Sequence, residues 1–123
     1  MAFQKNIALP TGVAGDYFRI AAFRWDRAAR EASALFALYK DAATAAAGQP
    51  LQPMAAKLRL TGAQFDTYLG PGALAAAADD VLAQLYAAAR EISEARHETG
   101  EPVAGAQIVS DHGSDLFWDA TDV

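Results

Sequence analysis

The chain has 123 residues, of which 53% are hydrophobic, and 15 acidic against 10 basic side chains give a formal net charge of −5. This length fits a single domain over residues 1–123, and the hydrophobic content excludes a disordered chain. The acidic balance argues against a general nucleic-acid-binding protein, and the absence of cysteine excludes disulfides, a thiolate nucleophile and a cysteine-based zinc site.

The chain opens with a weak strand pattern. Phe3 to Leu9 alternates between apolar and polar residues and predicts a short edge strand, which Pro10-Thr11-Gly12 ends in a turn. The N-terminus lacks the apolar core of a signal peptide, and no apolar run approaches the roughly eighteen residues of a membrane span. We therefore expect synthesis in the cytoplasm and no membrane partner.

Two segments rich in aromatic and apolar residues, Tyr17 to Trp25 and Ala32 to Lys40, flank the polar stretch Asp26 to Arg30. This arrangement predicts an antiparallel hairpin. A helix is the competing interpretation, because alanine is the best helix former and Arg24 to Ala47 fits one amphipathic helix. Periodicity alone leaves the two open. A regular extended backbone would put alternate residues of the first segment on one face, namely Tyr17, Arg19, Ala21, Phe23 and Trp25.

A third strand is predicted from Met54 to Thr61. Lys57 and Arg59 alternate there with apolar residues, so one face of the strand should be buried and the other basic. The apolar positions are Met54, Ala56, Leu58 and Leu60. Residues 1–61 are thus mainly strands, with a short helical turn that Asp41 can cap and Gly48 ends.

Residues 62–98 are predicted to be helical. Thr61 and Gln64 resemble a capping box for a short helix that Gly70-Pro71-Gly72 ends. One continuous helix is predicted from Ala73 to about His97, because its apolar residues form a single stripe. These residues are Leu74, Ala78, Val81, Leu82, Leu85, Tyr86, Ala89 and Ile92.

Residues 99–123 are predicted to form a loop followed by an aromatic tail. The run Leu116-Phe117-Trp118 should either return to the sheet or dock on a partner, because an aromatic terminus seldom stays free in solvent. The predicted fold class is therefore α+β, a small antiparallel β-sheet of three to five strands packed against one long helix in the C-terminal half and short helices.

The candidate chemical sites are weak, and we assign no catalytic residue, no cofactor and no metal. Glu94 and His97 have the spacing of a helical metal pair, but a di-iron site needs two such pairs and further carboxylates. Residues 110–115 include the residue types of a catalytic triad, yet neighbours on a loop cannot supply its geometry, so a polar turn or a loose cation site is expected. The residues assigned to interaction surfaces are aromatic: Trp25, Tyr39, Phe117 and Trp118.

The first half of the chain resembles a set of small structural proteins of bacteriophages and prophages. Those proteins often begin with a Lys-Thr-Ile-x-Leu-x-x-Gly run followed by a Tyr-x-x-Ile strand. Here Lys5 to Gly12 reads Lys-Asn-Ile-Ala-Leu-Pro-Thr-Gly, with Asn6 in place of the usual threonine, and Asp16 to Ile20 reads Asp-Tyr-Phe-Arg-Ile. The resemblance continues through Ser33 to Tyr39 and, loosely, to the closing residues 119–123.

The resemblance implies a non-enzymatic virion component, similar to proteins encoded among tail and baseplate genes, that assembles through protein–protein contacts. It also implies strands over Trp25 to Tyr39, which favours the hairpin. The implied partners are other tail or baseplate proteins and further copies in a homo-oligomer, without nucleic acid, and the implied location is the virion after synthesis in the host cytoplasm. The alternative is a small cytoplasmic binding or regulatory module that uses a surface around Trp25 and Tyr39.

Overall fold

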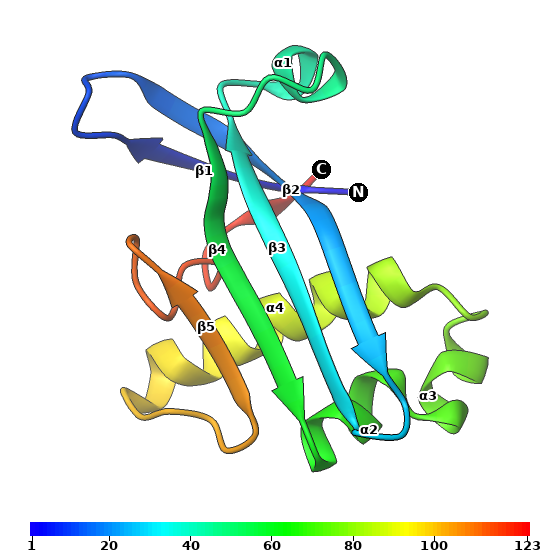
Figure 1. Ribbon diagram of the computed structural model, residues 1–123. Coiled ribbons are helices and arrows are strands. Elements are labelled where there is room, and N and C mark those ends of the chain that lie inside the picture. Colours follow the sequence, from blue (N-terminus) through cyan, green and yellow to red (C-terminus); the bar gives the residue numbers. More distant parts are fainter.

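The computed structural model describes residues 1–123 and shows a six-stranded antiparallel sheet that curls around a long helix (Figure 1). The strand order is β5-β4-β3-β2-β1-β6. The α+β class is confirmed, but the sheet has six strands rather than three to five. The strands are β1 (Phe3–Ala8), β2 (Ala14–Asp26), β3 (Glu31–Tyr39), β4 (Gln52–Thr61), β5 (Ala106–Ser110) and β6 (Thr121–Asp122).

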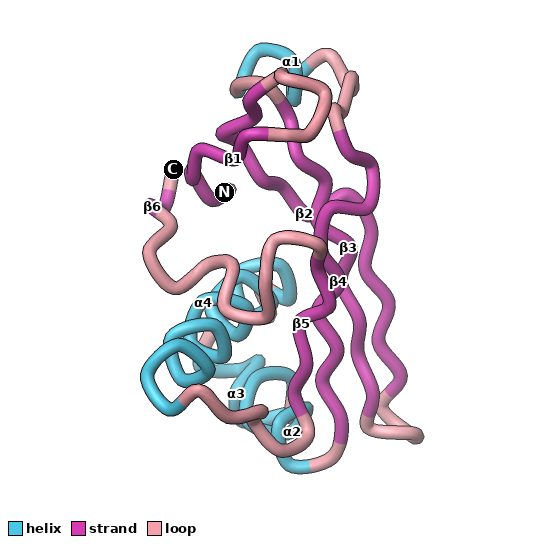
Figure 2. Tube along the Cα trace, turned by 90° about the vertical axis from the view of Figure 1, so that its left-hand side faces the viewer, coloured by secondary structure: helices cyan, strands magenta, loops and turns pink.

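The helices lie mainly on one side of the sheet. Figure 2 shows α2, α3 and α4 against the concave face, while α1 lies at one end of the strands. No helix is long and apolar enough to cross a lipid bilayer. The helices are α1 (Ala42–Ala46), α2 (Ala63–Leu69), α3 (Pro71–Ala76) and α4 (Val81–Thr99).

The predicted hairpin is confirmed. β2 and β3 pair from Tyr17 opposite Tyr39 to Asp26 opposite Glu31, and β4 pairs with the other side of β3. The competing helix over 24–47 is wrong, since the only helix there is α1, which the predicted Asp41 caps by accepting from the Thr44 N–H. A central strand gains pairing on both sides and apolar burial, and these outweigh the helix propensity of alanine.

A β-bulge in β2 changes which residues face the core. Ile20 lies opposite Phe36, but Ala22 rather than Ala21 lies opposite Leu35, so one extra residue enters β2. The prediction that every second residue from Tyr17 to Trp25 shares one face is therefore wrong. Core packing falls instead on Phe18 and Ile20 before the bulge and on Trp25 after it.

The core lies between the concave face and α4. Phe3, Phe18, Phe36 and Phe117 are fully buried there, and Tyr86 of α4 meets the rings of Phe3 and Phe36 edge-on with centroids 5.3 and 5.7 Å away. Aromatic pairs in this geometry add about 0.5–1.5 kcal/mol each beyond their area burial. This cluster is therefore a main source of the stability of the domain.

The predicted helix from Ala73 to His97 is two helices. α3 ends at Ala76, and Ala78 and Asp79 then adopt left-handed backbone angles, with φ of 54° and 61°. The Asp80 side chain accepts a hydrogen bond from the Ala83 N–H, so a new helix begins at Val81. The capping box predicted at Thr61 and Gln64 is also wrong, because Gly62 precedes α2 without a side-chain cap.

Residues 99–123 contain two strands and not only a loop and a tail. β5 pairs with β4, and the short β6 pairs with Phe3 and Gln4 of β1. β1, predicted as an edge strand, therefore has neighbours on both sides over its first residues. Leu116 and Phe117 are fully buried, so the aromatic tail returns to the core of its own chain.

Candidate interaction surface

β2 has an open edge over its second half. Its pairing with β1 ends at Phe18, which lies opposite Phe3, whereas its pairing with β3 continues to Asp26. The Ile20 N–H donates to the Tyr86 hydroxyl oxygen at 2.7 Å and therefore points away from β3. Burial raises the pKa of Tyr86 above its ordinary value, at which a tyrosine hydroxyl is already protonated at neutral pH.

The exposed main-chain groups on this edge can be assigned from the pairing. With the Ile20 N–H pointing outward, the bulge turns the N–H groups of both Ala21 and Ala22 toward β3. The alternation of an antiparallel ladder then directs the N–H and C=O groups of Phe23 and Trp25 outward. No loop or helix of the chain takes these two N–H groups. An unpaired strand edge of this kind is a template for a further strand.

Apolar side chains surround the open edge. Phe23 is 44% exposed on β2 and Leu82 is 42% exposed in the first turn of α4, while Met1 and Val123 are 70% and 51% exposed. Both termini and the start of α4 lie on the same side of the molecule as this edge (Figure 1). We call Met1, Phe23, Leu82, Val123 and the outward groups of Trp25 the β2-edge surface.

A hollow of about 510 Å³ adjoins the β2-edge surface between α4 and the two terminal strands. Tyr86 connects the hollow to the open edge, because it is one of the residues that line the hollow and its hydroxyl accepts from the Ile20 N–H. The hollow can receive apolar groups from a partner. It is lined by Met1, Ala83, Tyr86, Ala87, Arg90, Glu91, Asp122 and Val123.

The aromatic residues assigned to interaction surfaces are not brought together. Trp25 is half-buried and stacks on Phe65 at 6.4 Å, so its main chain rather than its ring is free for a partner. Tyr39 is 4% exposed in a small separate cluster with Ala37 and Ala45. The structure therefore provides no joint surface of Trp25 and Tyr39.

Phe117 and Trp118 have different environments although they are neighbours in sequence. Phe117 is fully buried and packs in the core, so its ring offers no exposed surface to a partner in the folded chain. Trp118 is 39% exposed and stacks on the imidazole of His97 with ring centroids 3.6 Å apart. His97 Nδ1 also lies 3.0 Å from an Asp115 carboxylate oxygen, and this hydrogen bond lowers the pKa of Asp115.

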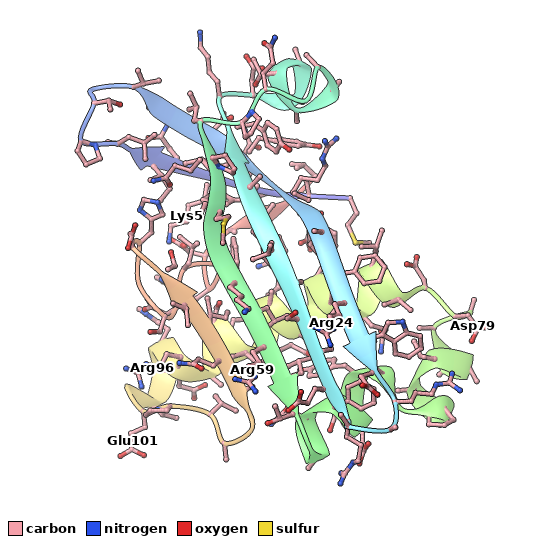
Figure 3. The ribbon with its side chains drawn as sticks, in the orientation of Figure 1. Lys5, Arg24, Arg59, Asp79, Arg96 and Glu101 are labelled. Atoms are coloured by element: carbon pink, nitrogen blue, oxygen red, sulfur yellow. The ribbon has the colours of Figure 1, made fainter.

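The basic outer face predicted for β4 is confirmed at Lys57 and Arg59, and it is wider than the sequence indicated. The predicted buried face is wrong at Met54, which is 73% exposed, because the pairing with β3 is irregular there and the alternation changes. Lys57 and Arg59 are exposed, and Arg24 of β2 stands in the same cross-strand row as Arg59, with Ser33 of β3 between them. Figure 3 shows Arg24 and Arg59 on the face turned away from the helices. The sequence did not reveal this row because its members come from three strands. Glu31, 3.5 Å from Arg59, partly neutralises it.

The weak chemical sites do not assemble into catalytic or metal-binding geometry. Glu94 approaches Arg90 at 3.9 Å, while His97 binds Asp115. His112 Nε2 lies 2.7 Å from the Gln52 side-chain oxygen, so it does not face a serine as a general base would. No group of three or more histidine, aspartate and glutamate side chains is arranged to hold a metal ion.

No protein-family model, no curated protein and no solved structure matches this chain. The β2-edge surface and the sequence resemblance are therefore the two observations that bear on the function of this chain.

Proposed function

We propose that this chain is a non-enzymatic structural component of a phage or prophage virion, acting in tail or baseplate assembly, and that the β2-edge surface binds a neighbouring subunit. The observation that carries the proposal is the open half of β2, with its outward N–H and C=O groups at Phe23 and Trp25. The opening motifs from Lys5 to Gly12 and Asp16 to Ile20 support the virion context by resemblance.

Strand addition at this edge has a clear energetic basis. A partner strand would pair with the outward groups of Phe23 and Trp25, and each such hydrogen bond contributes about 0.5–1.5 kcal/mol net. Main-chain pairing supplies affinity with little selectivity. The partner must therefore also cover Phe23, Leu82 and the adjoining hollow, whose burial contributes roughly 25 cal/mol per Å².

A stand-alone regulatory module receives no support from the geometry. That alternative needs Trp25 and Tyr39 on one ligand-binding surface, and they lie in separate clusters with Tyr39 buried. The β2-edge surface fits a protein partner better, because it offers a strand edge and not an enclosed polar pocket.

The proposal is tested by light scattering coupled to size-exclusion chromatography, over a wide concentration range, alone and with each tail-region protein encoded beside the gene. We expect a stable oligomer or co-complex. Phe23→Ala should weaken it through lost apolar contact, and Phe23→Pro should weaken it by about a further tenfold, because proline also removes the outward N–H. The internal β2–β3 ladder does not use that N–H.

Met54→Ala is the matched control, because Met54 is 73% exposed on β4, which has strand neighbours on both sides. It should leave association unchanged. A folded Phe23→Pro variant that associates as tightly as Phe23→Ala would show that no strand is added at this edge. A chain that stays monomeric with every tail-region protein would contradict the proposed function as a whole.

A further inference from the structure

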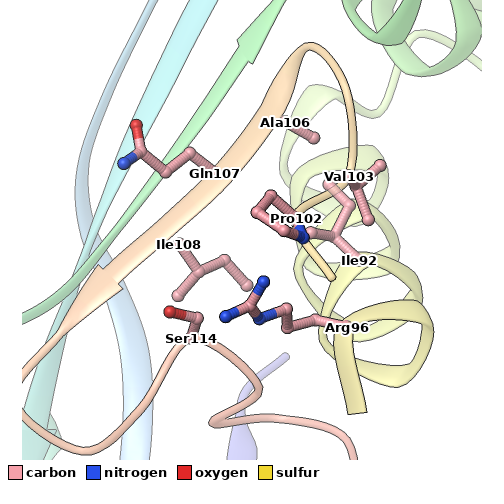
Figure 4. A pocket seen from close by; sticks show the side chains of 8 residues that line it. All are labelled: Ile92, Arg96, Pro102, Val103, Ala106, Gln107, Ile108 and Ser114. Atoms are coloured by element: carbon pink, nitrogen blue, oxygen red, sulfur yellow. The ribbon is translucent and has the colours of Figure 1, made fainter. Parts of the chain in front are cut away.

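A small pocket lies at the opposite edge of the sheet, between β5 and the C-terminal half of α4 (Figure 4). Its volume is about 130 Å³. An apolar protein cavity of about 150 Å³ holds a benzene molecule, so this pocket has room for one branched aliphatic side chain. Its lining residues are Ile92, Arg96, Pro102, Val103, Ala106, Gln107, Ile108 and Ser114.

The outer edge of β5 is unpaired at Ile108, whereas the Ala106 N–H is taken by the Val103 carbonyl. β5 is the last strand of the sheet on this side, so it has a neighbour only in β4. The Thr61 N–H donates to the Gly105 carbonyl at 2.8 Å, which places Gly105 in a pair directed at β4. By alternation, Gln107 also points to β4, while the N–H and C=O of Ile108 point to the open side. Ile108 therefore offers one donor and one acceptor next to the pocket.

Arg96 supplies a cation at the same place. Its side chain runs from α4 toward Ser114 and Ile108 (Figure 4). Arg96 forms no ion pair, like Arg19, Arg24 and Arg27, whereas Arg30, Arg59 and Arg90 each pair with a carboxylate. Among the arginines without an ion pair, Arg96 is the one that lines this pocket. A guanidinium group presents a planar fork of donors that matches a carboxylate.

We propose that the β5 pocket binds an extended segment of a partner protein in which a branched aliphatic residue and an acidic residue are two positions apart. The segment pairs with the Ile108 main chain, places its aliphatic side chain in the pocket and directs its carboxylate to Arg96. This site lies at the other end of the sheet from the β2-edge surface and takes a different, chemically defined partner.

The two-residue spacing follows from the geometry of the elements. Ile92, on the pocket wall, and Arg96 are one helical turn apart, which puts their side chains about 6 Å from each other along α4. Side chains at positions i and i+2 of a strand share a face and lie about 6.8 Å apart. α4 crosses β5 at a steep angle (Figure 1), so the two spacings agree in length and not in direction. The pocket and Arg96 both lie on the concave side of the sheet, where α4 packs, and only residues that share one face of an added strand can reach both. Adjacent residues of a strand point to opposite faces and cannot fill both places.

The test uses a fluorescently labelled five-residue peptide with blocked ends, in which threonine alternates with isoleucine at the second position and aspartate at the fourth. Binding to the full chain is followed by fluorescence anisotropy. Replacing the aspartate by asparagine should weaken binding by about ten- to a hundredfold, because a charge-assisted hydrogen bond is lost. A peptide with isoleucine and aspartate adjacent should bind as weakly as the asparagine peptide.

Two variants connect this preference to the pocket. Arg96→Gln should remove the discrimination between the aspartate and asparagine peptides, whereas Arg59→Gln, an arginine on the outer face, should preserve it. Circular dichroism would be used to check that both variants are folded. Phe23→Pro at the other edge should leave peptide binding unchanged. The failure of the peptide-binding proposal would therefore not count against the proposed function, and the reverse also holds.

Three outcomes would overturn the proposal: equal binding of the aspartate and asparagine peptides by the wild-type chain, discrimination that survives Arg96→Gln, and equal binding of the alternating and adjacent peptides. Inorganic phosphate serves as a further probe. If phosphate displaces the peptide at concentrations similar to that of the peptide itself, the site is a small-anion site and not a peptide site.

Discussion

Phe117 is the residue on which the core most depends. Its ring centroid lies 4.7 Å from that of Phe3, 4.8 Å from Phe36 and 5.3 Å from Phe18, and its side chain is fully buried. It thereby joins strands from three parts of the chain. We predict that Phe117→Ala lowers the free energy of unfolding by about 3–5 kcal/mol, measured by urea denaturation, because it opens a cavity that well-packed neighbours cannot fill.

The adjacent Trp118 is the natural control for Phe117→Ala. Trp118 is 39% exposed and contacts His97 in a stack at the surface. Trp118→Ala should therefore cost about 1 kcal/mol or less. A loss of similar size in both variants would mean that burial does not separate the two positions and would contradict the assignment of Phe117 to the core.

At the scale of the elements, the sequence predicted those features that depend on residues close to one another in the chain. The Asp41 cap and the basic positions Lys57 and Arg59 of β4 follow from residue types within a few positions of one another. The hairpin does not, because local periodicity fits a helix equally well and only the resemblance favoured strands. The bulge at Ala21 could not be seen, because it is defined by pairing with Leu35 and Phe36 on another strand. The break before Val81 had a local signal, the capping residue Asp80, which the longer apolar stripe concealed.

The open edges could not be predicted for a similar reason. Whether β2 or β5 has a second neighbour depends on the strand order of the whole sheet, which no local pattern encodes. The β5 pocket combines residues of α4, a loop and β5, so Arg96 carried no sequence signal as a binding residue. Phe117 was placed on an interaction surface because an aromatic run near the end of a chain fits a core and an interface equally well.

The bulge gives a prediction about β2 as an element. Ala21 is the extra residue, so deleting it should restore regular pairing and keep both Phe23 and Trp25 on the concave face. Deleting Arg24 instead should turn Trp25 away from Phe65, because the alternation changes between the bulge and Trp25. The measurement uses chains that also carry Trp118→Phe, so that Trp25 is the only tryptophan. The emission maximum should stay near that of the Trp118→Phe parent for the Ala21 deletion and shift to the red for the Arg24 deletion. Equal red shifts for the two deletions would disprove the assignment of which β2 residues face the core.

At the scale of the whole molecule, the N-terminal and C-terminal segments pair with each other and complete the fold. β6 pairs with β1, the Lys5 ammonium binds the Leu116 carbonyl and the Asp119 carboxylate at 2.8 Å each, and Arg90 of α4 binds the Ala120 carbonyl. Leu116 and Phe117 fill the space between the sheet and α4. The C-terminal segment is thus part of the domain and not an appendage held for a partner.

Removing residues 116–123 should therefore abolish cooperative unfolding, because the core loses two fully buried side chains and exposes the apolar surface beneath them. Thermal circular dichroism measures this directly. A shorter truncation that removes only residues 121–123 deletes the exposed β6 and should lower the melting temperature by a few degrees while keeping a cooperative transition. If the chain without residues 116–123 still unfolds cooperatively, the tail is dispensable to the core, and its aromatic residues become available again as a surface for assembly.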